Sequence, residues 1–187
     1  MRILLGAASV MILTLAACSS ESPPPEQPAS EQTSAVAPAR QAVAALRTAD
    51  GTDAGTVTAT EGPDGIRLAL NVIGLDAGER GVHVHTTGLC EGPDFASAGS
   101  HWNPTDKQHG LDAPGGHHAG DMPNLVIEQG GAGTLEYTLQ GATFDGLIDT
   151  DGSAFVVHAG RDDQITDPSG DSGDRVVCGV FEQVPAA

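Results

Sequence analysis

Histidines are concentrated in one region of this chain. All seven lie between His83 and His158, and no histidine precedes position 83. The densest part runs from His101 to Asp121, where Gly, Pro and polar residues separate His101, His109, His117, His118 and Asp121. Neutral imidazole and carboxylate groups are the ligands that a borderline divalent metal such as zinc prefers. The stretch therefore predicts a loop that binds a metal and is ordered by it.

Two further histidines are expected on a strand. His83 and His85 stand two residues apart in Gly81–His85, so their side chains share one face while Val82 and Val84 face the other way. His158 ends a predicted strand. Taken singly, such residues are as well explained by a polar face or a structural histidine. The concentration of all seven in one region favours metal binding.

The N-terminus reads as an export signal. Residues 1–17 contain one basic residue and an apolar run that is too short for a membrane span, as in a secretory signal peptide. Leu15-Ala16-Ala17-Cys18 resembles the lipobox of bacterial lipoproteins, which predicts that Cys18 is lipidated. The alternative is an ordinary signal peptide with an incidental cysteine.

The remainder divides into a tether and a domain. Residues 18–40 hold the predicted lipidated cysteine and a segment rich in Ser, Pro, Glu and Ala without apolar periodicity, which predicts a disordered tether. Residues 41–187 suffice for a single domain with its own core. In an exported protein the two remaining cysteines, Cys90 and Cys178, predict a disulfide. Two free buried thiols are the alternative.

Short runs of alternating apolar residues predict strands throughout this domain. Ile66, Leu68, Leu70 and Val72 show the clearest alternation. The predicted strands are 41–48, 55–60, 66–72, 81–85, 124–128, 133–139, 147–150, 154–158 and 175–181. With 25 glycines, few aromatic residues and no long amphipathic helix, the pattern indicates an all-β antiparallel sandwich or barrel. Residues 86–123 lack periodicity, so the metal and the disulfide are expected to order them.

The net charge of the chain argues against some classes of binding partner. The formal net charge is −17, without a basic stripe or an aromatic platform, which argues against nucleic acid. Such a chain repels anions on average. An enzyme acting on an anion would need a local positive region.

Six segments carry a family resemblance. Gly81-Val-His-Val-His85, Ser-Ala-Gly-Ser-His101-Trp-Asn-Pro, Gln-His109-Gly, His118-Ala-Gly-Asp121, Val-Val-His158 and Asp174-Arg175-Val-Val-Cys178-Gly resemble, in order, the signature segments of copper–zinc superoxide dismutases. The resemblance implies an eight-stranded antiparallel Greek-key barrel with long metal-organised loops. It also implies one copper and one zinc per chain.

The resemblance assigns ligands residue by residue. It gives copper to His83, His85, His101 and His158. It gives zinc to His101, His109, His118 and Asp121. His101 would then bridge both metals as an imidazolate. The choice of His118 over His117 rests on the three-residue step to Asp121, so a shift of register stays open.

Two more residues acquire roles by resemblance. Asp162 matches a carboxylate that hydrogen-bonds one copper histidine and one zinc histidine, with Asp163 as a competitor and a plain surface acid as the alternative. Arg175 matches an arginine that guides the anion to copper and, with His101, would be catalytic; a simple ion pair at a strand start is the alternative. The loop between Asp162 and Arg175 carries no basic residue, so long-range steering by lysines is not expected.

The implied function is dismutation of superoxide to oxygen and hydrogen peroxide by a bacterial enzyme anchored in the periplasm or cell envelope through a lipid on Cys18. Superoxide is the expected partner, the lipid is the only expected membrane contact, and monomer and homodimer both stay open. A non-catalytic copper- and zinc-binding or metal-delivery module on the same fold is the alternative. A dinuclear hydrolase fits less well, because one carboxylate stands against six imidazoles.

Overall fold

The computed structural model describes residues 39–185. The predicted signal peptide (1–17), Cys18 and the tether up to residue 38 lie outside the described residues. Within residues 39–185, no helix is long and apolar enough to span a membrane.

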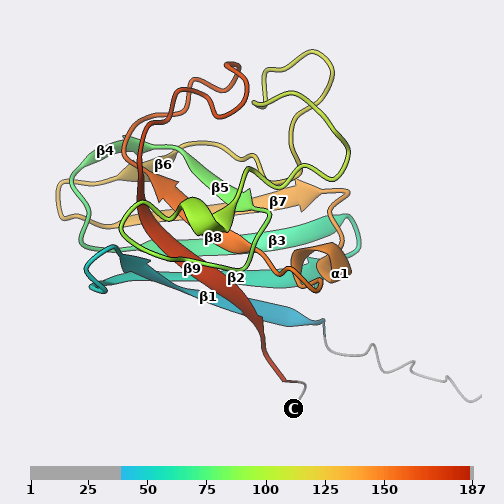
Figure 1. Cartoon of the computed structure of the whole chain (residues 1–187), viewed down its shortest axis with the longest axis horizontal. Coiled ribbons are helices and arrows are strands. Elements are labelled where there is room, and N and C mark those ends of the chain that lie inside the picture. Colours follow the sequence, from blue (N-terminus) through green and yellow to red (C-terminus); the bar gives the residue numbers. More distant parts are fainter. Residues whose placement is uncertain (1–38, 186–187) are drawn as a thin grey trace, which may run out of the picture. The chain divides into compact units, whose positions relative to one another are not determined.

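Nine strands and two short helical turns make up the described part (Figure 1). The strands are β1 (Gln41–Thr48), β2 (Asp53–Gly62), β3 (Gly65–Val72), β4 (Gly78–Arg80), β5 (Val82–His85), β6 (Leu125–Ile127), β7 (Gly133–Gln140), β8 (Ala154–His158) and β9 (Arg175–Gln183). The turns are the 3₁₀ helix η1 (Ala96–Ala98) and the α-helix α1 (Phe144–Leu147).

The strands form an antiparallel Greek-key barrel. Seven are hydrogen-bonded in the order β5-β8-β9-β1-β2-β3-β7, and β4 pairs with β6. β4 and β5 are separated by Gly81 alone, while β6 and β7 are joined by a turn in which Glu128 N donates to Ala132 O at 2.8 Å. The β4–β6 pair therefore links the two ends of the large sheet. With β4 and β5 counted as one interrupted strand, the barrel has eight strands, which confirms the predicted fold class.

Most of the expected strands are present, but the one expected at 147–150 is wrong. Thr143 Oγ1 accepts a hydrogen bond from Gly146 N at 3.2 Å and caps α1, so Leu147 is buried at the end of a helical turn. β4 was not expected, because three exposed or half-exposed residues offer no alternation.

The alternation predicted for residues 66–72 is confirmed by the main core. Ile66, Leu68, Leu70 and Val72 are all buried inside the barrel, and β1, on the other side of β2 in the sheet, contributes Ala42, Ala44 and Leu46. Burying one such aliphatic side chain is worth about 1.5–3 kcal/mol. This core stabilises the strands that carry the histidines.

The strands β5 and β8, and residues 177–179 of β9, are buried on both faces. Toward the main core they present Val82, Val84, Phe155, Val157 and Val177. The opposite face carries the histidines of β5 together with Ala154, Val156 and Cys178, which pack against Phe95 and Ala98 of the 86–124 loop. The histidines therefore point out of the barrel and are covered by long loops.

Candidate metal centre

Backbone pairing brings the 86–124 loop against the free side of β5. One edge of β5 is hydrogen-bonded to β8, and two isolated antiparallel bridges join the other edge to the loop, His85 to His101 and His83 to Asp121. Residues opposite one another in antiparallel pairs project to the same face. The loop residues His101 and Asp121 are thus placed beside the two strand histidines.

His158 reaches this face from the end of β8. The register between β8 and β9 shifts between Val157 and His158, where His158 pairs with Arg175. Such a bulge redirects a side chain at the end of a ladder. The ring of His158 lies 4.9 Å from that of His83, centroid to centroid.

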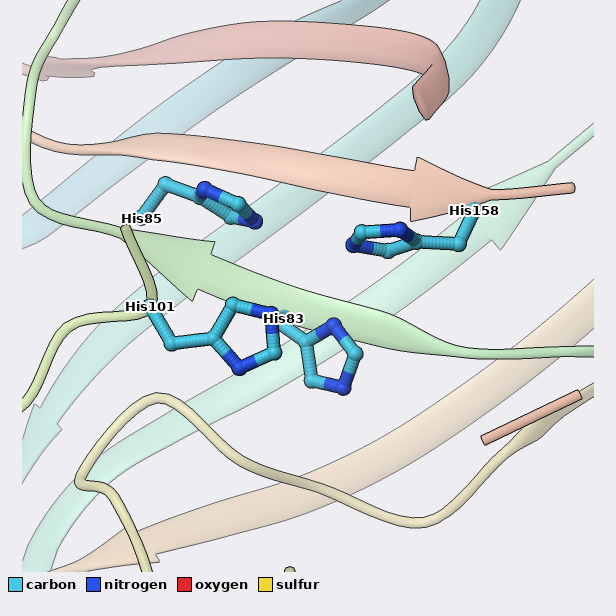
Figure 2. A group of neighbouring side chains, drawn as sticks. All are labelled: His83, His85, His101 and His158. Carbon is cyan, nitrogen blue, oxygen red and sulfur yellow. The ribbon is translucent and has the colours of Figure 1, made fainter. Parts of the chain in front are cut away.

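These side chains form one cluster of four buried imidazoles (Figure 2). Ligand atoms of His83, His85, His101 and His158 all lie within 4.8 Å of one another. One nitrogen of each ring has no hydrogen-bond partner among residues 39–185: Nδ1 of His83 and Nε2 of the other three. Four converging lone pairs of this kind fit a metal that prefers nitrogen ligands, such as copper.

The second nitrogen of three of these rings is held by the surrounding backbone or a carboxylate. His85 Nδ1 donates to Gly99 O at 2.9 Å and His158 Nδ1 donates to Gly173 O at 3.0 Å. His83 Nε2 donates to Asp162 Oδ2 at 2.6 Å. A carbonyl accepts only, so each contact fixes a tautomer whose lone pair faces the cluster.

Burial keeps these rings neutral. Desolvation lowers the pKa of His83 to about 3, that of His85 to about 2 and that of His158 to about 4. Metals bind the neutral imidazole. The cluster is therefore in its binding-competent form across the physiological range.

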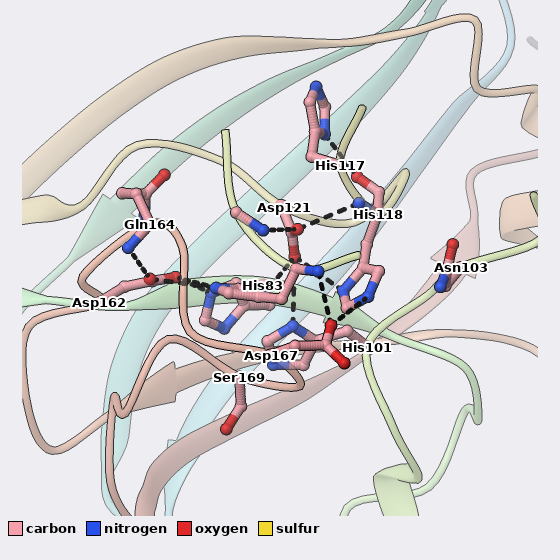
Figure 3. A network of polar contacts seen from close by, with 12 residues as sticks. His83, His101, Asn103, His117, His118, Asp121, Asp162, Gln164, Asp167 and Ser169 are labelled. Atoms are coloured by element: carbon pink, nitrogen blue, oxygen red, sulfur yellow. Dashed lines mark hydrogen bonds and ion pairs between the residues drawn. The ribbon is translucent and has the colours of Figure 1, made fainter. Parts of the chain in front are cut away.

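A second cluster surrounds Asp121 (Figure 3). Its Oδ1 lies 3.2 Å from Nδ1 of His101, 3.2 Å from Nδ1 of His109 and 3.3 Å from Nδ1 of His118. Its Oδ2 accepts hydrogen bonds from Gly110 N at 2.8 Å and His118 N at 3.1 Å. Three imidazole nitrogens and one carboxylate oxygen directed at one point fit a closed zinc site.

Two other histidines lie near this second cluster. The ligand atoms that lie within 4.8 Å of one another are those of His83, His101, His109 and Asp121, a group that does not contain His118. His83 lies within 4.8 Å of the ligand atoms of His101, His109 and Asp121, but its Nε2 is engaged by Asp162. His117 is half-buried and its Nδ1 donates to His118 O at 2.7 Å. His118 is the one whose Nδ1 faces Asp121.

Asp121 and His109 shift each other's pKa. Burial alone would raise the pKa of Asp121, but the hydrogen bond from His101 and the close rings of His109 and His118 hold it far below its usual range. Burial alone would lower the pKa of His109, but the carboxylates of Asp121 and Asp162 beside its two ring nitrogens raise it to about 9. At neutral pH an ionised Asp121 therefore faces a protonated His109, and a metal cation bound here would replace that proton.

His101 belongs to both clusters. Its Nδ1 faces Asp121, and its Nε2 is the unpartnered nitrogen directed at His83, His85 and His158. Desolvation lowers its pKa, so the ring is neutral and can offer a lone pair. The two sites therefore share one imidazole ring.

Asp162, not Asp163, lies between the clusters. Besides His83 at 2.6 Å, its carboxylate lies 3.1 Å from His109 Nε2, and hydrogen bonds from both rings keep its pKa well below the usual range despite burial. Asp163 accepts from Thr166 N at 2.8 Å and caps its own turn. Gly170 packs so closely on the Asp162 carboxylate that a Cβ there would collide with Oδ1, and its φ of 65° is in the left-handed region.

Arg175 lies beside the four-imidazole cluster, tied to the loop that covers it. Its Nη1 donates to Phe95 O and its Nη2 to Gly99 O, both at 2.7 Å. Gly99 O also accepts from His85, so the guanidinium and a cluster histidine share one carbonyl. Arg175 contributes to lowering the pKa of His85 and His158, which places its positive charge close to both.

The predicted disulfide is present. Cys90 and Cys178 are bonded, with their Cα atoms 5.7 Å apart and a sequence separation of 88. The bond fastens the start of the 86–124 loop to β9, three residues beyond Arg175. It therefore helps to hold the carbonyl groups that Arg175 contacts.

Some residues that support the site carried no recognisable signal in the sequence. The side-chain amide of Asn124 pairs with the backbone of Asp162, donating to its O and accepting from its N, each at 2.8 Å. Asp167 Oδ1 accepts from His109 N at 2.7 Å. Short polar residues in loops are common, and only their long-range partners identify them.

Comparisons with known proteins agree with this geometry. The sequence profile described as copper/zinc superoxide dismutase matches residues 53–181. A protein named Superoxide dismutase [Cu-Zn] from Caulobacter vibrioides is 43% identical over 75% of this chain and 85% of its own length. The superoxide dismutase-like protein YojM from Bacillus subtilis is 40% identical over 63% of each chain.

A solved structure extends the likeness to three dimensions. The Cu/Zn superoxide dismutase from Brucella abortus matches with a TM-score of 0.64 and 28% identity, covering 76% of this chain and 99% of the other. Copper and zinc are the metals of this family, and the two buried histidine clusters fit them. The chain therefore belongs to the copper/zinc superoxide dismutase family.

Proposed function

We propose that this protein is an enzyme that dismutes superoxide to oxygen and hydrogen peroxide. In this proposal copper is held by His83, His85, His101 and His158. Zinc is held by His101, His109, His118 and Asp121, with the His101 imidazolate bridging the two metals. The observation that carries the proposal is the set of converging imidazole nitrogens that lack partners in the described chain, divided between two sites that share His101.

When bound, copper supplies the alternating one-electron chemistry that oxidises one superoxide and reduces another. The protein residues supply ligand geometry, charge and protons. His101 can carry the proton: its Nε2 has no hydrogen-bond partner within residues 39–185, so it can hold a hydrogen when it is not a ligand. Meanwhile the hydrogen bond to Asp121 holds Nδ1, the other nitrogen of the His101 ring, in place.

Arg175 supplies the positive charge that an anionic substrate needs. The chain carries a net charge of −17, so long-range forces disfavour superoxide. The guanidinium is half-buried and oriented by two carbonyls at the edge of the copper cluster. Together with the metals it would form a local positive region that binds and orients the anion.

A metal-binding or metal-delivery module is the second candidate, and one observation favours it. A relative that is 40% identical is named superoxide dismutase-like, and this name does not assert the enzymatic activity. Against it, this chain retains a four-imidazole cluster and an oriented arginine, which storage does not require.

Metal analysis combined with an activity assay separates the two candidates. The enzyme should bind about one copper and one zinc per chain, show a Cu(II) EPR signal typical of nitrogen ligands, and dismute superoxide faster than free copper. His158→Ala should abolish the activity, while His117→Ala, outside both clusters, should leave it intact. A metal-loaded wild-type protein no faster than free copper would refute the enzyme and favour the module.

We also propose that the enzyme works in the bacterial periplasm or cell envelope, anchored by a lipid on Cys18. The signal-like residues 1–17, the lipobox-like segment and the disulfide support export. Labelled fatty acid should be incorporated into the wild-type protein and not into Cys18→Ser. Equal labelling of both would refute the anchor.

A further inference from the structure

Gln164 stands out among the residues that the ligand assignment leaves unused. Its φ of 68° is left-handed, a conformation that is uncommon for residues other than glycine, and the residue is 9% exposed. Its side-chain Oε1 is buried and finds no hydrogen-bond partner within the described range. A strained backbone and an unpaired polar atom persist where the surrounding structure imposes them, often at functional sites.

The backbone of Gln164 orients the Asp162 carboxylate. Gln164 N donates to Asp162 Oδ1 at 2.6 Å, as Figure 3 shows. With this oxygen engaged, Oδ2 is directed to His83 Nε2 at 2.6 Å. The left-handed turn at Gln164 is therefore part of what places the carboxylate between His83 and His109.

Gln164 is also tied by three contacts to residues 110–122, the part of the 86–124 loop that carries His118 and Asp121 and that we call the zinc loop. Its Nε2 donates to Met122 O at 3.3 Å, next to Asp121. Its carbonyl accepts from Asp112 N at 3.2 Å, and a Cβ at Gly110 would collide with that carbonyl. Gly110 N in turn donates to Asp121 Oδ2 at 2.8 Å.

We propose that Gln164 is a positioning residue that couples the zinc site to the copper site. Gln164 holds the zinc loop against the turn that orients the Asp162 carboxylate. Because this carboxylate binds His83, an ordered zinc loop would fix the orientation of His83 at copper. The inference rests on the ligand assignment of the proposed function. It adds a residue that touches neither metal and acts through Asp162.

Two substitutions separate the side-chain amide from the backbone conformation. Gln164→Met keeps a similar length and removes the amide. Gln164→Gly removes the side chain but adopts a left-handed φ without strain. Gln183→Met is the matched control, because Gln183 is exposed at the end of β9.

Zinc affinity and the copper signal are the readouts. In the full-length copper-free protein, chelator competition should show zinc affinity about tenfold weaker in both Gln164 variants. With both metals bound, their Cu(II) EPR spectra should shift toward that of the zinc-free wild type. Gln183→Met should match the wild type in both measurements.

A purely structural role predicts a different result. Thermal unfolding would then occur at lower temperature in the Gln164 variants, while zinc affinity and the EPR spectrum stayed as in the wild type, and this would overturn the proposal. Gln164→Gly with wild-type zinc affinity would equally overturn the role of the amide. Both readouts are independent of turnover, so a wild-type protein that binds both metals without dismuting superoxide would refute the proposed function alone.

Discussion

The Nε2–H of His83 donates a hydrogen bond to Oδ2 of Asp162 at 2.6 Å, and both side chains are fully buried. The same carboxylate lies 3.1 Å from His109 Nε2. One ring belongs to the candidate copper cluster and the other to the candidate zinc cluster. Asp162 is therefore a second link between the two sites, in addition to the shared ring of His101.

Replacing this carboxylate should weaken zinc binding. Asp162→Asn keeps the shape, but its NH₂ group would face N–H donors of His83 or Gln164 instead of accepting from both. Loss of such a ligand-orienting partner costs about 10- to 100-fold in metal affinity. Chelator competition measures this loss. Asp163→Asn is the control, and an equal loss in the control would contradict the assignment to Asp162.

Arg175→Ala should lower kcat/KM for superoxide about tenfold or more at low ionic strength, with both metals retained, because the local positive charge is lost. Stopped-flow kinetics over a range of salt concentrations checks this. Arg161→Ala is the matched control, because Arg161 is exposed and pairs with Glu79 at 2.9 Å. Unchanged kinetics in Arg175→Ala at low salt would refute its role in binding the anion.

Zinc affinity should rise with pH up to about pH 9. In the metal-free protein the pKa of His109 is raised from its ordinary 6.5 to about 9, so the ring is protonated at neutral pH and zinc must displace a proton from Nδ1. One displaced proton makes affinity increase about tenfold per pH unit below the pKa. Competition titrations at several pH values test this, and an affinity independent of pH would contradict it.

The stability of the metal-free fold should change with pH in the direction opposite to zinc affinity. Because the folded-state pKa of His109 is above its ordinary value, the protonated ring stabilises the fold fully below pH 6.5. This contribution should decline as the pH rises toward about 9. Denaturant titrations of the metal-free protein at about pH 7.5 and pH 9 should show lower stability at the higher pH. In this range the rings of His83, His85 and His158 are neutral in both the folded and the unfolded chain. An equal loss in His109→Ala would contradict the assignment to His109.

Removing the disulfide should destabilise the metal-free protein by about 4.6 kcal/mol, the loop-entropy value for a loop of this length. The double substitution Cys90→Ser and Cys178→Ser, followed by urea unfolding, measures it. Reduced wild-type protein should show the same loss. A loss below about 1 kcal/mol would mean that the fold holds the loop without the bond.

Local patterns in the sequence were enough for several features. Alternation at Ile66, Leu68, Leu70 and Val72 predicted a strand with one buried face, because side chains alternate along any strand. Two cysteines in a chain with a predicted export signal predicted the disulfide. The weak strand expected at 147–150 failed, because the Thr143 cap and burial of Phe144 and Leu147 override local propensity.

By itself, the sequence determined the residue types, their order and therefore the metal chemistry available to the chain. Only the tertiary structure decided which atoms meet: that His101 lies opposite His85, that Asp162 rather than Asp163 faces His83, and that Gln164 contacts Met122. These contacts join residues far apart in the chain. They depend on which strands and loops pack together, which the periodicity within one segment does not specify.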